Sequence, residues 1–186
     1  MKVYEYKDYD EYVEIQTEAN KEKLGWFFVT PRVIKAILED NPMVGSVLCH
    51  GTRGGAEQYE FQKHLPHAYV IGTEISEHCR NVPMTVQWDM QVPKEEWIGK
   101  FDIVYSNSFD HCIWPDKTMV TWAHQLSQHG ALYLEYSEQQ STGSAHDPLD
   151  ATLEEVIQLM QDAGLKVKDL ATRGKSNSII LRGKKS

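Results

Sequence analysis

The sequence of 186 residues predicts an α/β fold: a doubly wound, mostly parallel seven-stranded sheet with the last strand antiparallel, helices on both faces and an N-terminal helical extension. Three observations predict it. From residue 46 onward, short apolar runs alternate with segments of helical periodicity, as in right-handed βαβ crossovers. Only residues 171–177 separate the last two apolar runs, too few for a crossover helix, so these strands should pair antiparallel. Two helical patterns precede the first run.

The N-terminal extension is predicted to contain two helices. Apolar residues recur at helical spacing after Asp10 until Gly25, which stops the first helix. The second helix begins at Thr30, an N-cap residue followed by a proline in the first turn, and ends at Asn41, before another proline.

Residues 44–186 are predicted to form one ligand-binding domain, and residues 1–43 to form a helical segment that packs on the site or caps it. The strands are expected at Ser46–His50, Ala68–Thr73, Met84–Trp88, Phe101–Ser106, Ala131–Tyr136, Leu165–Leu170 and Ser178–Arg182. The helices are expected at Gly55–His64, at Pro115–Gln128 and in a segment capped by Asp150 and closed by Ala163-Gly164.

Composition restricts the partners. Lys and Arg total 19 against 27 Asp and Glu, a net charge of 19 − 27 = −8, so duplex nucleic acid is not expected as a substrate. No apolar run approaches the roughly 20 residues of a membrane span, and the charged N-terminus does not resemble a signal peptide, so no membrane contact is expected. Cys49, Cys79 and Cys112 lack CxxC spacing, which favours reduced thiols and a cytoplasmic location. The oligomeric state stays open.

Candidate ligand-binding residues follow the predicted strands, because ligands of doubly wound sheets collect at the carboxyl ends of the strands. Gly51 opens a glycine-rich turn after the first strand. Glu74 follows the second, 74 − 51 = 23 residues later, near the roughly 20 at which an acidic side chain binds the ribose hydroxyls of a nucleoside. Asp89 follows the third and is placed to accept a hydrogen bond from an exocyclic amine such as that of adenine.

Together these segments resemble the class I S-adenosylmethionine-dependent methyltransferases, a Rossmann-like family. The five motifs of the family resemble VLCHGTRGG, VIGTEIS, VQWDM, FDIVYSNSFDH and GALYLEY, in the family's order, over about Val44 to Arg182. The resemblance implies S-adenosylmethionine as cofactor and methyl transfer as the reaction. The cofactor-binding residues that it implies are Gly51, Thr52, Arg53, Gly54, Glu74, Ile75, Asp89, Met90, Asn107 and Ser108.

The first motif departs from the family's pattern at two positions. Cys49 stands where many members have an acidic residue, and Arg53 replaces the middle glycine of the loop. We expect the guanidinium of Arg53 to bind the free carboxylate of the cofactor, since an arginine can hold a carboxylate bidentately. Other roles remain open: Arg53 can pair with Glu57 four residues on, Glu74 can cap a helix, Asp89 can be an ordinary turn acid, and the glycines can serve a tight turn alone.

His111 is the candidate catalytic base because it follows the fourth strand and its ordinary pKa of ~6.5 lets it accept a proton at neutral pH. The alternative is a loop histidine that caps the turn before Trp114-Pro115, and His146 is a weaker second candidate. A small-molecule acceptor is expected. Its determinants are predicted in the N-terminal helices and in two loops: Tyr12, Gln16, Asn20, Trp26, Asn107–Pro115 and Glu138–Asp147.

A metal site is not predicted. Three His–Cys neighbours fall near the expected ligand edge, at residues 49–50, 78–79 and 111–112, but no CxxC or HxxxH spacing accompanies them. Two rival functions remain open. A non-catalytic subunit of the same fold is compatible with the altered first motif, whereas a nicotinamide-dependent oxidoreductase needs the G-x-G-x-x-G that this chain lacks.

Overall fold

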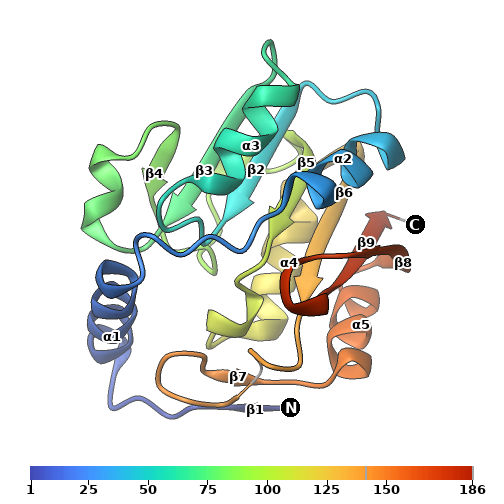
Figure 1. Ribbon diagram of the computed structural model, residues 1–186. Helices are drawn as coiled ribbons and strands as arrows, with labels where there is room; N and C mark the ends of the chain where they lie inside the picture. The colour runs from blue at the N-terminus through green and yellow to red at the C-terminus, as the bar shows by residue number, and fades with distance from the viewer. Residues whose placement is uncertain (141, 186) are drawn as a thin grey trace.

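The computed structural model describes residues 1–140 and 142–185; Ser141, within the loop predicted from Glu138 to Asp147, and Ser186 lie outside the described residues. The fold is a seven-stranded sheet of order β4-β3-β2-β5-β6-β9-β8 (Figure 1). Its strands are β2 (Ser46–His50), β3 (Tyr69–Glu74), β4 (Thr85–Gln87), β5 (Phe101–Ser106), β6 (Leu126–Tyr136), β8 (Leu165–Arg173) and β9 (Ile179–Lys185). Strand β9 runs antiparallel to both neighbours while β2 to β6 pair in parallel, which confirms the predicted fold class.

Helices cover both faces of the sheet. Helices α2 (Pro31–Asp40) and α3 (Ala56–His64) lie on one face, and α4 (Pro115–Gln125) and α5 (Leu153–Asp162) lie on the other. Successive strand residues point to opposite faces, so Val47 and Cys49 pack into the cluster under α2 and α3, while Leu48 packs into the cluster under α4 and α5. The sheet therefore has two apolar layers, one on each side.

Helix α1 (Tyr9–Glu22) stands apart from the helices that cover the sheet (Figure 1). Its N-cap is Asp8, whose carboxylate accepts from Glu11 N at 2.9 Å, so the helix begins before Asp10, which lies in its first turn. The chain before α1 forms a two-residue strand, β1 (Lys2–Val3), that pairs antiparallel with β7 (Leu149–Asp150). This small sheet was not predicted, because two-residue strands carry no periodic signal.

Helix α4 ends three residues earlier than predicted, at Gln125 and not at Gln128. Leu126 is buried as the first residue of β6, paired with Phe101, and a register irregularity follows before the regular pairing at Ala131. Gly130 permits this irregularity, since a Cβ there would lie 2.5 Å from the carbonyl oxygen of Phe101. The apolar pattern of this segment fits a helix and a bulged strand equally well, which explains the error.

The N-cap of α5 is Thr152 and not Asp150. Thr152 Oγ1 accepts from Glu155 N at 3.3 Å, and Glu155 Oε2 accepts from Thr152 N at 2.9 Å, which forms a capping box. Asp150 is the last residue of β7 and pairs with Lys2. The sequence Thr-x-x-Glu carried this signal, but Asp150 also has an N-cap side chain and stands close to the same boundary.

Replacing Thr152 with Ala should lower the free energy of unfolding by about 0.5–2 kcal/mol, because an amide of the first turn loses its acceptor. The matched Asp150→Ala should change it by less than about 0.5 kcal/mol, as expected for an exposed position away from a cap. Urea unfolding of both variants measures the difference. Equal losses would contradict the assignment of the cap to Thr152.

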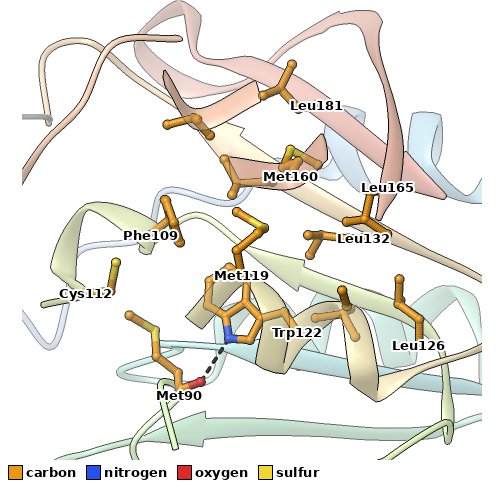
Figure 2. Packing of buried hydrophobic residues seen from close by; sticks show 14 of the residues in the cluster. Met90, Phe109, Cys112, Met119, Trp122, Leu126, Leu132, Met160, Leu165 and Leu181 are labelled. Carbon is orange, nitrogen blue, oxygen red and sulfur yellow. Dashed lines mark hydrogen bonds between the residues drawn. The ribbon is translucent and has the colours of Figure 1, made fainter. Parts of the chain in front are cut away.

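The cluster between the sheet and α4 reaches the carboxyl edge of the strands. Trp122 of α4 is fully buried, and its indole N–H donates to Met90 O at 2.9 Å (Figure 2). Met119 and Phe109 pack beside the same ring. Met90 follows β4, so this hydrogen bond holds the backbone at the carboxyl end of β4 against the core.

Candidate functional site

A pocket lies at the carboxyl ends of β2, β3, β4 and β5. The segments that follow these strands form its floor and walls, and one face of α1 covers it. Its lining residues are Tyr12, Gln16, Asn20, Gly51, Arg53, Thr73, Glu74, Ile75, Trp88, Asp89, Met90, Ser108 and His111.

The structure brings together eight of the eleven predicted site residues: Gly51, Arg53, Glu74, Ile75, Asp89, Met90, Ser108 and His111. The other three lie outside the lining. Thr52 is buried, with its amide donating to Thr73 O at 3.0 Å, and Gly54 faces a different hollow, near Phe27. Asn107 donates to Glu57 Oε1 at 3.1 Å. Thr73 and Trp88 line the pocket and were not predicted, although each directly precedes a predicted residue.

The turn after β2 requires its glycine. Gly51 has φ of +69°, and a Cβ at this position would lie 2.7 Å from Ser108 Cβ. Ser108 Oγ also donates to Gly51 O at 3.1 Å, so the turns after β2 and β5 are in contact. Arg53 has φ of 43°, a left-handed conformation that few residues other than glycine adopt. The backbone here is therefore held in an unusual shape next to the pocket.

Glu74 is buried at the end of β3, and its carboxylate accepts four hydrogen bonds. Oε1 accepts from Asn20 Nδ2 at 2.7 Å and from the amide and hydroxyl of Ser76 at 2.9 and 2.6 Å. Oε2 accepts from Arg53 N at 2.9 Å. Glu74 thus ties the turn after β2 and helix α1 to the end of β3.

Arg53 joins the turn after β2 to the C-terminal end of α1. Its Nε donates to Asn20 Oδ1 at 3.1 Å, and Nη1 donates to the carbonyl oxygens of Lys23 and Trp26 at 3.4 and 3.3 Å. Within residues 1–140 and 142–185, Arg53 forms no ion pair with Glu57, so that alternative does not describe this structure. Trp26 contributes its backbone here, while its side chain is 60% exposed and does not line the pocket.

Asp89 also connects to α1. Its Oδ2 accepts from Tyr9 Oη at 2.7 Å, and its Oδ1 accepts from Gln91 N at 2.9 Å. Burial, together with the hydrogen bond to Asp89, raises the pKa of Tyr9 above its ordinary value, so the phenol stays a donor. Asp89 therefore closes a local turn and also faces the pocket.

The imidazole of His111 is oriented by Gln16 of α1. Gln16 Nε2 donates to the carbonyl oxygens of Ala145 and His146 at 3.4 and 3.1 Å, which turns Gln16 Oε1 toward His111 Nδ1 at 2.9 Å. Because Oε1 only accepts, Nδ1 carries the proton. The alternative turn-capping role is not observed, since Gln91 Oε1 accepts from the amides of Ile113 and Trp114.

The chain matches no protein-family model and no curated protein sequence. Its structure does match solved structures. A Burkholderia thailandensis 1,6-didemethyltoxoflavin-N1-methyltransferase, solved with S-adenosylhomocysteine, aligns with a TM-score of 0.73 at 14% identity, covering 98% of this chain and 92% of the other. A Thermotoga maritima S-adenosylmethionine-dependent methyltransferase, described as a possible histamine N-methyltransferase, aligns with a TM-score of 0.65 at 17% identity. The alignment covers 94% of this chain and 100% of the other. The chain has the fold of the class I S-adenosylmethionine-dependent methyltransferases.

A third structure with this methyltransferase fold, a sugar N-methyltransferase from a Streptoalloteichus species, aligns with a TM-score of 0.64 at 16% identity over 100% of this chain and 96% of the other. The antiparallel β9 also separates the methyltransferase fold from the dehydrogenases, which need a sixth parallel strand. None of the helices in the described residues has the length and apolar composition that a bilayer span requires.

Asn107 and Glu57 form a buried pair outside the lining of the pocket. Burial raises the pKa of Glu57 to about 7, and Glu57 Oε2 has no hydrogen-bond partner among the described residues. Glu57 lies in the first turn of α3, and Asn107 follows β5, so the pair joins two segments that are 50 residues apart. Asn107 acts in the structure as a partner of this buried acid.

The three His–Cys neighbours do not form one site. Cys49 packs under α2 and α3, whereas the ring of His50 stacks on Trp122 at 4.9 Å on the opposite face. Burial lowers the pKa of His50 to about 4, so it stays neutral. Cys112 is buried in the cluster under α4, and all three cysteines are free thiols. One group of possible metal ligands is found in the described part of the chain, and it contains none of the cysteines: Asp110, His111 and Asp147.

Proposed function

We propose that this protein is an S-adenosylmethionine-dependent methyltransferase that acts on a small-molecule acceptor. The observation that carries the proposal is the convergence of Gly51, Glu74 and Asp89 on one pocket. They lie at the carboxyl ends of the neighbouring strands β2, β3 and β4, which are about 4.8 Å apart. A nucleoside lying across these strand ends meets a tight backbone turn, a carboxylate for the ribose and a carboxylate for the adenine amine, in that order.

The residues of the pocket fit this cofactor. Glu74 Oε2 accepts one hydrogen bond among the described residues, so it keeps a lone pair for a ribose hydroxyl. In the same part of the chain Arg53 Nη2 donates no hydrogen bond, which leaves that group for the carboxylate of the methionine moiety. Ile75 and Met90 provide apolar surface for the adenine ring, and Ser108 borders the turn at Gly51.

The cofactor supplies a methyl group on a sulfonium, which is already activated, so the chain has to align the acceptor and exclude water. We assign the covering role to residues 1–43, since Tyr12, Gln16 and Asn20 of α1 lie over the pocket. His111 is the catalytic residue that we propose. With Nδ1–H held by Gln16, its Nε2 lone pair is available to take the proton of a hydroxyl or ammonium acceptor.

Calorimetric titration with S-adenosylmethionine, S-adenosylhomocysteine and NAD tests the proposal. We expect micromolar binding of the first two and none of NAD. Binding of NAD alone would favour an oxidoreductase. Binding of none of the three ligands would favour a subunit that has no cofactor. A labelled-methyl screen against small-molecule extracts then separates an enzyme from a non-catalytic binder, because only an enzyme transfers the label.

Replacing Arg53 with Ala should weaken S-adenosylhomocysteine binding tenfold or more, on the order of the 1.5–3 kcal/mol of a charge-assisted hydrogen bond. Adenosine, which lacks the carboxylate, separates the two roles of this side chain. If Arg53 binds the carboxylate, the loss is larger for S-adenosylhomocysteine than for adenosine. If it acts only by holding α1, both ligands weaken equally. The control is Arg80→Ala, an exposed arginine bonded to Gln87. Unchanged affinity would refute both roles.

A further inference from the structure

Two carboxylates face the free nitrogen of His111. Asp110 Oδ2 and Asp147 Oδ1 each lie 3.7 Å from His111 Nε2, and the three residues each offer one ligand atom within 4.8 Å of the other two. Asp110 and His111 belong to the short turn after β5, while Asp147 comes from the segment before β7. These separations exceed hydrogen-bond length, so neither carboxylate oxygen is hydrogen-bonded to Nε2.

The ring nitrogen of His111 that faces the two carboxylates carries a lone pair. Gln16 Oε1 fixes the proton on Nδ1, as described above, so in the neutral ring Nε2 is an acceptor. A ligating histidine usually has this arrangement, with its second nitrogen donating to an amide, carbonyl or carboxylate that fixes the ring. Gln16 is itself held by the carbonyl oxygens of Ala145 and His146, which lie directly before Asp147. Residues 145–147 thus supply one candidate ligand, Asp147, and also hold the glutamine that orients the ring of His111.

The third observation is an oxygen without a partner. Asp110 Oδ2 is buried and has no hydrogen-bond partner among the described residues. Leaving a buried carboxylate oxygen unpaired is costly, and native structures avoid it unless an ion or water compensates. This oxygen faces His111 Nε2.

We propose that Asp110, His111 and Asp147 bind a divalent cation of the first transition row. Two ligand atoms at about 2.1 Å from one ion lie roughly 3.4–3.6 Å apart at tetrahedral or trigonal angles, close to the 3.7 Å that separates His111 Nε2 from each carboxylate oxygen. Three protein ligands also leave coordination positions open, as in catalytic metal sites.

The consequence for catalysis rests on the proposed function. His111 lines the cofactor pocket, so an ion on its Nε2 would lie at the wall of that pocket, where an oxygen or nitrogen of the acceptor can complete the coordination. A ligated Nε2 does not take a proton. In the ion-bound protein the cation would instead lower the pKa of the acceptor group, whose proton would pass to solvent water before methyl transfer.

The test uses tag-free full-length protein stripped with a chelator, with no methyl donor present, so that it does not depend on the proposed function. Mn²⁺ is titrated while the electron paramagnetic resonance signal of free Mn²⁺ is followed, and Zn²⁺ is titrated by calorimetry. We expect one site per chain, with binding weakened at least tenfold in Asp147→Asn. Glu138→Gln, which removes one exposed negative charge from the same connection, should bind as the unmodified protein does. Gln16→Leu should weaken binding about 10–100-fold through loss of the ring orientation.

Thermal unfolding of each stripped variant shows whether it is folded, and Asp110→Asn replaces Asp147→Asn if the latter is not. Absence of saturable Mn²⁺ and Zn²⁺ binding to the folded unmodified protein would overturn the proposal. Equal affinity in the Asp147 and Glu138 variants would also overturn it. If the protein binds the cation but does not bind S-adenosylhomocysteine, the metal site is supported and the methyltransferase assignment is refuted.

Discussion

Replacing Glu74 with Gln should weaken S-adenosylhomocysteine binding by about 100-fold or more and lower the free energy of unfolding by about 1–3 kcal/mol. Among the pocket residues in the described part of the chain, no other carboxylate accepts from four different donor groups. Both carboxylate oxygens of Glu74 accept hydrogen bonds: Oε1 from Asn20 and Ser76, and Oε2 from the amide of Arg53.

The reason is that a glutamine side chain has one oxygen and one NH₂ group. If the NH₂ takes the place of Oε1, it meets the donors of Asn20 and Ser76; if it takes the place of Oε2, it meets the amide of Arg53. The first orientation leaves three donors without an acceptor, and the second leaves the half-buried amide of Arg53 without one; each unmet donor costs about 1–3 kcal/mol. The second orientation also removes the acceptor that we assign to the ribose diol.

Urea unfolding and calorimetry with S-adenosylhomocysteine measure the two effects. Glu77→Gln is the control, because Glu77 is exposed, lies three residues away in the following turn and has the same charge. Loss of stability with unchanged ligand affinity would mean that Glu74 only ties α1 to the sheet. Unchanged values for both would contradict the hydrogen bonds described here.

The sequence predicts the strand-end residues of the site because of a general property of parallel sheets. The strands end at one edge, so whatever follows β2, β3, β4 and β5 must converge. Ordered apolar runs were therefore enough to bring Gly51, Glu74 and Asp89 to the same pocket. In the same way, the shortness of residues 171–177 was enough to reverse β9.

Contacts set by long-range packing could not be predicted in this way. Gln16 and Asp147 approach His111 from α1 and from the segment before β7, and no periodicity relates these segments. Asn107 was predicted to bind the cofactor because it follows a strand, but the sequence does not show that Glu57 would be buried against it. Strand order fixes which backbone segments meet, whereas the direction of each side chain depends on the partners available there.

Replacing Gly51 with Ala should lower the free energy of unfolding by about 2–3 kcal/mol and weaken S-adenosylhomocysteine binding about 30-fold or more. Two costs combine. A left-handed backbone costs a residue with a Cβ roughly 1–2 kcal/mol, and the added Cβ would lie 2.7 Å from Ser108 Cβ. Ser108 moves away only if the turn after β5 moves with it, which displaces the pocket wall.

A double-mutant cycle with Ser108→Gly separates these costs. Removing Ser108 Cβ relieves the contact but leaves the left-handed backbone, so Gly51→Ala should cost only about 1–2 kcal/mol in the Ser108→Gly background. The expected coupling is about 1 kcal/mol, measured by urea unfolding of the four proteins. Ligand affinity should recover in parallel, since the same displacement of the turn after β5 causes both losses. Additive effects would mean that the turns after β2 and β5 are not in contact in solution. They would then contradict the pocket geometry, in which Gly51 and Ser108 line the same wall.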